Sequence, residues 1–314
     1  MDNKNIDLSV VVINYKMNRE LPRTILSLSA AMQKGIAQSL YELVVVDNGS
    51  PETIAVEREI KNAAEAGVPI SFYRFDKASP SPAAAVNFGV RKARGNLIGV
   101  MIDGARLASP GLLAGARMAA RLHERPVITS LAFHLGPAVQ AMSILDGYDQ
   151  SKEDALLDSV RWTEDGYRLF DISVLALSSA GGYFLPVAES NSLFMPCSLW
   201  HELGGLDENF TSPGGGLVNH DTFIRACELP NTCPIVLLGE GTFHQVHGGI
   251  STNAVVSPFD DFHDEYVRIR HKDLAAPTRE AILLGRVPPQ ALPVIESSAR
   301  IALDRLGRSG QRSQ

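Results

Sequence analysis

The sequence predicts an α/β fold in which a doubly wound, mostly parallel sheet is flanked by helices. Three observations support this prediction. Short runs of β-branched and other apolar residues, typical of strands buried on both faces, alternate with segments whose apolar residues recur at helical spacing. This alternation repeats through the first third of the chain, as expected of parallel strands joined by right-handed crossovers. Of the 314 residues, 45% are hydrophobic, which excludes a disordered chain and suffices for a large core.

The first third of the chain is expected to form strands and helices in strict alternation. The strands are residues 8–15, 41–47, 69–75 and 97–103. The helices lie within residues 19–33, 51–67 and 81–96, where Pro51 suits a first turn and Gly67 and Gly95 suit helix ends. Ligands of such sheets bind beyond the carboxyl ends of the strands. The polar residues that follow the strands are therefore candidate site residues.

The rest of the chain is less regular. A charged stretch, residues 151–171, has no clear periodicity, and we interpret it as an insertion over the site. The expected elements around it are a helix over 110–124, a strand over 126–136, a strand and a short helix within 191–210, a glycine-rich loop and a helix within 214–229, and a strand within 234–249 that delivers two histidines. Beyond Phe259 we expect a mainly helical tail.

Composition narrows the class of protein. A net charge of -6 and a pI near 5.8 argue against nucleic acid as the main partner, because binding a polyanion usually needs a basic face. The three cysteines have no C-x-x-C spacing, so the sequence indicates neither a disulfide framework nor a zinc knuckle. No apolar stretch is long enough for a signal segment or a membrane span. We therefore expect a cytoplasmic protein, with at most a peripheral association at the inner membrane face.

Several segments, taken in order, resemble one enzyme family. They are "LSVVVINYKMNRELPRTILSL", "YELVVVDNGSPE", "AAAVNFGVRKARGNLIGVMIDGA", "NSLFMPCSLWHELGGLDENF" and "NHDTFIR". Over roughly residues 8–250 the chain resembles the inverting family 2 glycosyltransferases, which have the GT-A fold, a Rossmann-like sheet flanked by helices. The resemblance implies a GT-A domain over 1–258, with a nucleotide-binding half to about 108 and an acceptor-side half from about 109, followed by a helical extension over 259–314.

The same resemblance implies an activity. Members of the family transfer a sugar, often a hexose, from a nucleotide diphosphate to an acceptor hydroxyl, and they usually need a divalent cation, Mn²⁺ or Mg²⁺. The implied partners are a donor of the UDP, GDP or dTDP type and a glycan or lipid-linked acceptor. Asp47 stands where the family's second-strand aspartate recognises the donor base, although Asp-Asn-Gly-Ser is also ordinary turn chemistry. Asn14 and Tyr15 follow the first strand and are expected to line the base pocket, and Asn87 is expected to face the donor.

Asp103 occupies the first position of the family's Asp-x-Asp pair, in "MIDGAR". The second position is Ala105, so one carboxylate ligand is missing. Three explanations stay open: coordination by Asp103 with a histidine from elsewhere, a metal-free mechanism that uses a cation such as Arg106, or loss of activity. The family's usual chemistry needs oxygen ligands for a hard cation that bridges two phosphate oxygens.

His244 and His247, in "FHQVHGG", favour the first explanation, because the GT-A fold often supplies a late histidine to the metal. On an extended segment, residues three apart point to opposite faces, so only one of the two is expected to reach the cation. We favour His247, because the adjacent glycines allow a close approach to a diphosphate. A mixed Asp and His site suits Mn²⁺ at least as well as Mg²⁺.

Asp221 occupies the position of the family's catalytic base, with His220 in place of the usual glutamate. The alternative is a helix cap. Asp207 and Glu208, in "GGLDENF", correspond to residues near the acceptor and the donor sugar, although a turn role fits Asp207 equally well.

Two other functions compete with sugar transfer. Ala105 could mark a degenerate member that binds nucleotide sugars or glycans without turnover. A metal-dependent hydrolase or nucleotidyltransferase could instead combine the two histidines with acidic and imidazole groups of residues 260–263, namely Asp260, Asp261 and His263. The second alternative lacks the helical H-E-x-x-H spacing.

Overall fold

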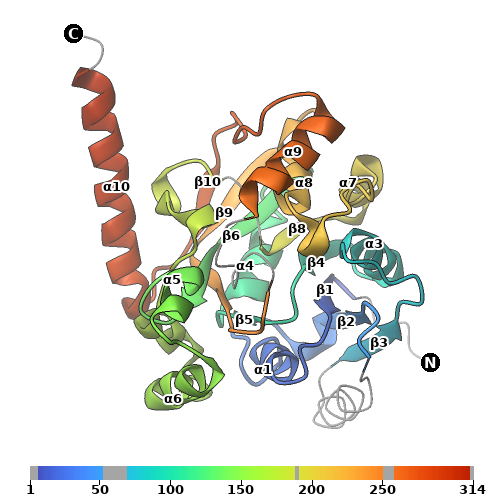
Figure 1. Ribbon diagram of the computed structural model, residues 1–314, viewed down its shortest axis with the longest axis horizontal. Coiled ribbons are helices and arrows are strands. Elements are labelled where there is room, and N and C mark those ends of the chain that lie inside the picture. The colour runs from blue at the N-terminus through green and yellow to red at the C-terminus, as the bar shows by residue number, and fades with distance from the viewer. Residues whose placement is uncertain (1–5, 52–68, 188–190, 250–257, 312–314) are drawn as a thin grey trace.

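A single sheet of ten strands organises the protein (Figure 1). The computed structural model describes residues 6–51, 69–187, 191–249 and 258–311. The strands are β1 (Leu8–Asn14), β2 (Tyr41–Asp47), β3 (Ile70–Arg74), β4 (Leu97–Met101), β5 (Arg106–Ala108), β6 (Pro126–Leu135), β7 (Ser173–Leu175), β8 (Leu193–Pro196), β9 (Cys233–His244) and β10 (Ile282–Gly285). Their order is β10-β9-β6-β8-β4-β1-β2-β3, with β5 added to β9 and β7 to β6.

Most neighbouring strands are parallel, as the sequence predicted. Parallel pairs join β3, β2, β1 and β4 on one side and β6, β9 and β10 on the other. The short strands β5, β7 and β8 run antiparallel to their partners, and β8 links the two halves by pairing with both β4 and β6. The sheet is therefore mixed at its centre and parallel on both sides.

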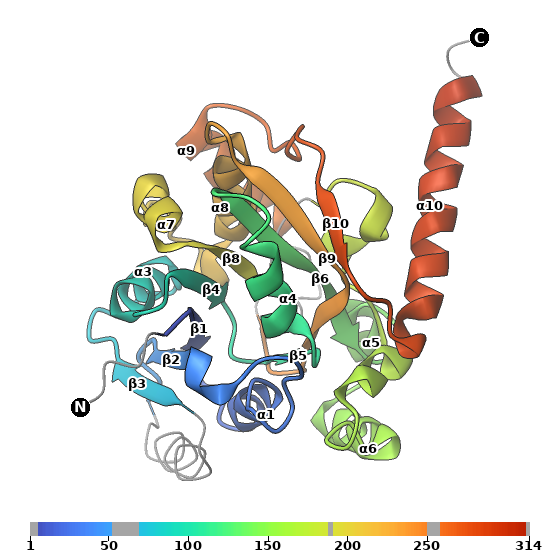
Figure 2. The ribbon, with the colours of Figure 1, turned by 180° about the vertical axis from the view of Figure 1, so that it is seen from behind.

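Helices cover both faces of the sheet (Figures 1 and 2). They are α1 (Glu20–Ser27), α3 (Ala83–Lys92), α4 (Leu112–Ala119), α5 (Gln140–Leu145), α6 (Gln150–Val160), α7 (Cys197–Leu203), α8 (Val218–Glu228), α9 (Phe259–Arg270) and α10 (Leu292–Gln311). The side chains of Val11 and Val44 pack into one apolar cluster with α3, α7 and α8, whereas those of Val10 and Val45 pack into another with α1 and α4. This double burial explains why β1 and β2 read as continuous apolar runs. The helix expected over 51–67 lies outside the described residues, apart from Pro51.

The strand ends face a common edge. Asn14 pairs with Asp47 at the ends of β1 and β2, and Val12 pairs with Met101 at the end of β4. Asn14 and Asp103 each lie two residues beyond that last pair. The expected donor residues therefore share the carboxyl edge of the sheet.

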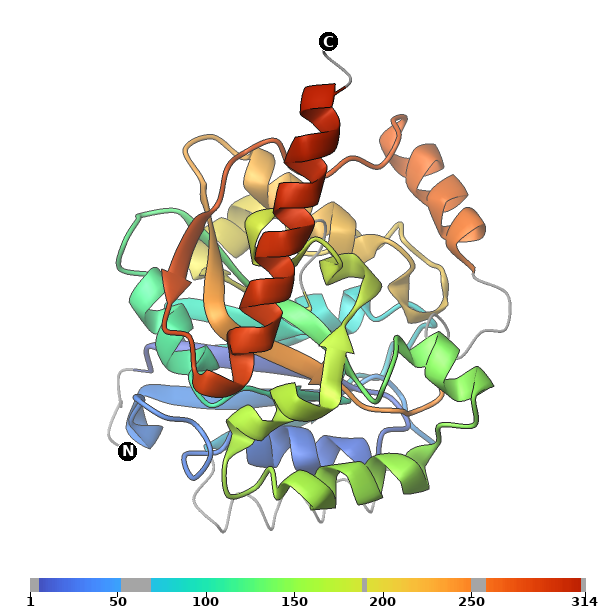
Figure 3. The same cartoon turned by 90° about the vertical axis from the view of Figure 1, so that its left-hand side faces the viewer.

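The second half of the chain departs from the prediction in two places. The charged stretch forms α6 and a 3-10 helix, Gly166–Ile172. The tail is mainly helical but also contributes β10, which pairs in parallel with β9, so it is not a purely helical extension. The sequence did not predict β10, because its four residues, which lie among polar residues and prolines, are too few to show the pattern of a strand. Helix α10 then runs along one side and away from the body (Figure 3).

Over the ranges that the structure describes, no helix combines the length and apolar character needed to cross a bilayer.

Candidate metal and donor site

Asp103, His244 and His247 form a compact cluster beyond the end of β4. His244 Nε2 lies 2.9 Å from Asp103 Oδ2, His247 Nε2 lies 3.5 Å from the same oxygen, and the two imidazole nitrogens are 3.1 Å apart. Neighbouring ligands of an octahedral cation with bonds of about 2.1 Å are separated by about 3 Å. Within the described residues this is the one group of three or more His, Cys, Asp or Glu side chains with ligand atoms close enough for a metal. One carboxylate and two imidazoles make a donor set that fits a divalent transition metal.

Both histidines reach Asp103, although on a regular extended segment residues three apart would point to opposite faces. Strand β9 ends at His244, so the backbone from Gln245 onward no longer alternates as a strand does. The Gln245 N–H donates to the carbonyl of Ala105, which ties this segment to the turn that carries Asp103. His247 is thereby brought back to the same carboxylate as His244.

A second layer of polar groups orients His244. The Oε1 atom of Gln140 lies 2.5 Å from His244 Nδ1. Since an amide oxygen accepts, Nδ1 carries the hydrogen, which leaves Nε2 as the ring nitrogen that a cation would bind. The backbone N–H of Gln140 in turn donates to His134 Nδ1 at 2.9 Å. Metal-bound histidines are commonly oriented in this way by an acceptor at the other ring nitrogen.

Burial and the mutual contacts of Asp103, His244 and His247 set the charges of the cluster. Burial lowers the pKa of His244 to about 4 against the pull of Asp103, so its imidazole is neutral at pH 7. Burial tends to raise the pKa of Asp103, but the two imidazoles more than offset it and hold that pKa well below its usual range. For His247 the nearby carboxylate outweighs burial and raises the pKa. Arg106 adds a guanidinium whose Nε is 3.8 Å from Asp103 Oδ2.

The packing around Ala105 explains how the missing carboxylate is accommodated. The Ala105 side chain is fully buried in the apolar cluster, and its N–H donates to Asp103 Oδ1 at 2.8 Å. Strand β5 begins at the next residue, where Arg106 pairs with His244 across the two strands. This pairing brings the turn after β4 to the end of β9.

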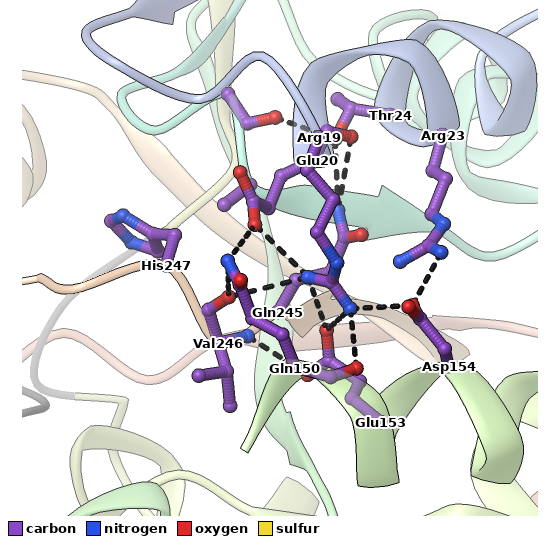
Figure 4. Close-up of polar contacts among 12 residues, drawn as sticks. Arg19, Glu20, Arg23, Thr24, Gln150, Glu153, Asp154, Gln245, Val246 and His247 are labelled. Carbon is purple, nitrogen blue, oxygen red and sulfur yellow. Dashed lines mark hydrogen bonds and ion pairs between the residues drawn. The ribbon is translucent and has the colours of Figure 1, made fainter.

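Arg19 holds the chain segment next to His247 (Figure 4). Its guanidinium donates to the carboxylates of Glu20, Glu153 and Asp154 and to the carbonyls of Gln150 and Val246. The other oxygen of Glu153 accepts the Val246 N–H at 2.8 Å. Arg19 and Glu153 of helix α6 thus fix both polar backbone groups of the residue that precedes His247.

The expected base pocket lies at the ends of β1 and β2. Asp47 is fully buried, and its Oδ1 accepts from Asn14 Nδ2 at 2.7 Å while its Oδ2 accepts the Ser50 N–H at 3.0 Å. Asp-Asn-Gly-Ser therefore forms the turn that its sequence also predicted. Each oxygen of the Asp47 carboxylate keeps one further lone pair. Tyr15 is 47% exposed beside these residues, with Lys16 Nζ 5.1 Å from its ring centre.

Asp221 lies in a separate cluster of ion pairs. Although the side chain is only 1% exposed, its Oδ2 accepts from Arg225 Nε and from Arg270 Nη2, each at 2.7 Å, and its Oδ1 accepts from Arg270 Nε. Arg270 also donates to Asp207 at 2.7 Å. The cluster links α8 to α9, and no contact of Asp221 with Asp103 joins it to the metal cluster in the part of the chain described.

The remaining expected site residues have structural contacts. Asn87 Nδ2 donates to the carbonyl of Leu206 and to Glu208 Oε1, and Asn87 Oδ1 accepts the Leu206 N–H. Asn87 therefore ties α3 to the loop that carries Glu208. His220 is half-buried on α8, next to Asp221. Asp260, Asp261 and His263 lie on α9, outside the metal cluster, which removes the basis of the hydrolase alternative.

Sequence reasoning missed Gln140, Arg19, Arg225 and Arg270. Gln140 is 104 positions from His244, Arg19 is 134 from Glu153, and Arg270 is 49 from Asp221. None of these three distant pairs lies within one motif, whereas Arg225 and Asp221 both lie in "NHDTFIR". The i, i+4 spacing of Asp221 and Arg225 on one helix is the only signal that was available.

The comparisons confirm the resemblance and the fold. Residues 9–103 match the model of the family described as Glycosyl transferase family 2. The structure of S. aureus TarS 1–349 has a TM-score of 0.53 at 14% identity, covering 84% of this chain and 64% of that one. TarS 1–349 in complex with UDP-GlcNAc gives 0.54 at 15% identity, covering 84% and 65%.

GalNAc-T7 with UDP, GalNAc and Mn²⁺ has a TM-score of 0.55 at 15% identity, covering 86% of this chain and 48% of that one. This chain therefore spans less than two thirds of each of these solved chains. At such identities the likeness shows the GT-A fold. No protein of curated function matches the sequence.

Proposed function

We propose that the protein is a glycosyltransferase that moves a sugar from a nucleotide diphosphate to an acceptor hydroxyl with inversion. The observation that carries the proposal is the Asp103–His244–His247 cluster at the carboxyl edge of a GT-A sheet. The family match over residues 9–103 supports it. The described complexes of TarS with UDP-GlcNAc and of GalNAc-T7 with UDP, GalNAc and Mn²⁺ support the same class of donor and cation.

Asp103, His244 and His247 are the residues that would hold the cation, Mn²⁺ or Mg²⁺. When bound, the cation offsets the negative charge that grows on the departing diphosphate. Arg106 offers guanidinium donors beside Asp103 for the same charge. Asn14, Tyr15 and Asp47 would hold the nucleoside at the ends of β1 and β2, with the free lone pairs of Asp47 facing N–H groups of the base.

Asp221 is the proposed base. The acceptor oxygen attacks the anomeric carbon, its proton passes to a carboxylate, and the bond from that carbon to the diphosphate oxygen breaks. Attack opposite the leaving group inverts the configuration. Asp221 is 1% exposed beneath its contacts with Arg225 and Arg270, so a hydroxyl reaches this carboxylate only after the packing around it opens. Asp207, which shares Arg270 with Asp221, and the sequence neighbours Glu208 and His220 would contact the sugar or the acceptor.

The engagement of Asp221 also favours a second candidate, a GT-A module that binds a nucleotide sugar or glycan without turnover. Nucleotide binding by a wild-type protein that never releases nucleotide from a sugar donor would support the binding module. Turnover in the presence of Mn²⁺ would exclude it.

Thermal unfolding with UDP, GDP, dTDP and their sugars, with and without Mn²⁺, tests the proposal. A nucleotide at about 100 times its Kd stabilises the native state by about 2.7 kcal/mol. We expect one nucleotide series to raise Tm and Mn²⁺ to enlarge the rise. Asp103→Asn should abolish the Mn²⁺-dependent part, whereas Asp171→Asn, an exposed carboxylate paired with Arg168, should not.

No stabilisation by any nucleotide would contradict the proposed function. The base assignment has its own test, because Asp221→Asn should retain nucleotide binding and lose nucleotide release from the donor. Turnover that survives this change would remove Asp221 from the mechanism.

A further inference from the structure

Lys16 is an exposed cation at the edge of the sheet where the expected donor residues lie. It follows β1 and Tyr15, and its Nζ lies 5.1 Å from the centre of the exposed Tyr15 ring. In the part of the chain that the structure describes, this ammonium has no carboxylate partner. Because ligands of such sheets bind at this edge, a cation without an acidic partner there favours an anionic ligand.

The backbone of Lys16 is held in a left-handed conformation, with a φ of 57°. This conformation costs free energy, because the Cβ of an L-residue comes close to the following carbonyl oxygen. The other described non-glycine residues with positive φ are in ordinary settings, since Arg161 and His271 end helices and Asn231 is an asparagine. Lys16 instead follows a strand. Strained residues that their surroundings hold in place are concentrated at ligand sites.

Ser50 connects the Lys16 backbone to the expected base pocket. The Lys16 N–H donates to Ser50 Oγ at 2.9 Å, and the same Oγ lies 3.4 Å from Asn14 Nδ2. The Ser50 N–H in turn donates to Asp47 Oδ2 at 3.0 Å. The turn that carries Asp47 therefore also fixes the position of Lys16.

The segment after β1 also packs directly against the turn that carries Asp103. A Cβ at Gly104 would lie 2.9 Å from the carbonyl oxygen of Ile13 and 3.3 Å from Met17 Sδ, so this approach requires glycine. Lys16 lies between Ile13 and Met17 in the chain. Its flexible four-carbon side chain therefore starts between the residues expected to hold the nucleoside and the proposed metal ligands.

The charge of the proposed donor needs a further cation at this place. The diphosphate of a nucleotide sugar carries two negative charges, and it gains a third when its bond to the sugar breaks and the electron pair stays on oxygen. Asp103 and Arg106 offset each other's charge, so a divalent cation alone would match only the intact donor. Resting on the proposed function, we propose that Lys16 is a further donor-binding residue, whose ammonium pairs with the diphosphate.

Binding measurements with two ligands of one nucleotide series test this assignment. The series is the one that raises Tm most among UDP, GDP and dTDP. The ligands are the diphosphate, followed by calorimetry, and the nucleoside, followed by saturation-transfer NMR, each with Mn²⁺. Lys16→Met should weaken the diphosphate by about five- to twentyfold, because one charge-assisted contact is lost. The affinity for the nucleoside should not change, because the nucleoside carries no phosphate.

Three further variants separate the charge from the shape of the loop. Lys16→Arg keeps a cation and should retain most of the affinity for the diphosphate. Lys16→Gly accepts the left-handed backbone without strain, so it should stay folded and weaken the diphosphate as Lys16→Met does. Lys34→Met is the matched control and should bind as the wild type does. Lys34 Nζ lies 5.3 Å from the centre of the Tyr167 ring and 3.7 Å from Asp165 Oδ1, and neither partner is an expected site residue.

The dependence of binding on salt gives an independent measurement. Added KCl should weaken the diphosphate more steeply in the wild type than in Lys16→Met, because salt screens an ionic contact. An unchanged affinity of Lys16→Met for the diphosphate, or an equal loss for the nucleoside, would overturn the phosphate contact while the proposed function stands. If no nucleotide of any series binds to the wild type with Mn²⁺, the inference and the proposed function are both wrong.

Discussion

Replacing Arg19 by methionine removes the cation that joins α1, α6 and the segment before His247 (Figure 4). The guanidinium is 23% exposed, but two of its carboxylate partners are nearly inaccessible: Glu153 is 0% exposed and Glu20 is 2% exposed. Removing one partner of a buried ion pair costs about 3–5 kcal/mol, because the other charge stays buried without compensation. The partial exposure of Arg19 places the expected loss at the lower end, about 3 kcal/mol at pH 8.

The loss of folding stability in Arg19→Met should depend on pH. The titration of Glu153 decides whether that loss grows or shrinks as the pH rises. Burial raises the pKa of Glu153 from 4.5 to about 7, partly offset by the Val246 N–H and Arg19. A carboxyl with a raised folded-state pKa contributes stability that is complete below pH 4.5 and is lost as pH rises through the folded pKa. Without Arg19 that pKa rises further. The variant therefore loses an additional amount above pH 7, at up to about 1.4 kcal/mol per pH unit.

Urea denaturation at pH 5 and pH 8 measures both effects. Arg168→Met is the control, because Arg168 makes a surface pair with Asp171 at 3.1 Å, with side chains 48% and 37% exposed. We expect the control to lose less than about 1 kcal/mol at either pH. Arg19→Met should lose more than the control at pH 5 and clearly more again at pH 8. Equal losses for the two variants, or no change with pH, would refute this account of the Arg19 contacts.

Two further changes test the site and the loop beside it. Gln140→Leu should weaken Mn²⁺ binding about 10- to 100-fold by calorimetry, since the acceptor that orients His244 is lost; an unchanged Kd would show that Gln140 does not orient the ligand. Gly205→Ala should lower the free energy of unfolding by about 1–3 kcal/mol beyond any loss in Gly204→Ala. Both glycines have positive φ, but only at Gly205 would a Cβ meet another side chain, 2.3 Å from Asn87 Oδ1. Equal chemical-denaturation curves for the two alanine variants would contradict that clash.

The strands that position the site were predictable because they are buried on both faces. β1 and β2 put alternate valines into two separate apolar clusters, which leaves no polar position within their central runs. β10 was not predictable, since its side chains are mostly exposed and it is fixed by backbone pairing to β9. Pairing with a distant strand leaves no periodicity in a four-residue segment.

Candidate site residues could be predicted from the sequence where the type of residue alone indicates its chemistry. Asp103 stood out through the resemblance to the Asp-x-Asp pair, and His244 and His247 stood out as two late imidazoles close to adjacent glycines. Their supporting contacts are set by tertiary structure: Gln140 reaches His244 only because α5 follows β6, the parallel neighbour of β9. Likewise, the sequence favoured Asp221 as a base but gave no sign of Arg270, which belongs to another helix and occupies its carboxylate.

The Asp103–His244–His247 cluster bears on why alanine stands at position 105, where the family has a second aspartate. The side chain at position 105 is fully buried in the apolar cluster that also contains Met17 and Leu21, so a carboxylate there would be buried among hydrocarbon groups at a large desolvation cost. The imidazoles of His244, at the end of β9, and of His247, beyond it, reach Asp103 instead. Exchanging a second carboxylate for imidazole ligands would leave the proposed ligand set with one negative charge, and Arg106 adds a positive charge beside it. A divalent cation held there would keep more net positive charge than one between two carboxylates, which favours a diphosphate leaving group and argues against degeneration as the meaning of the missing aspartate.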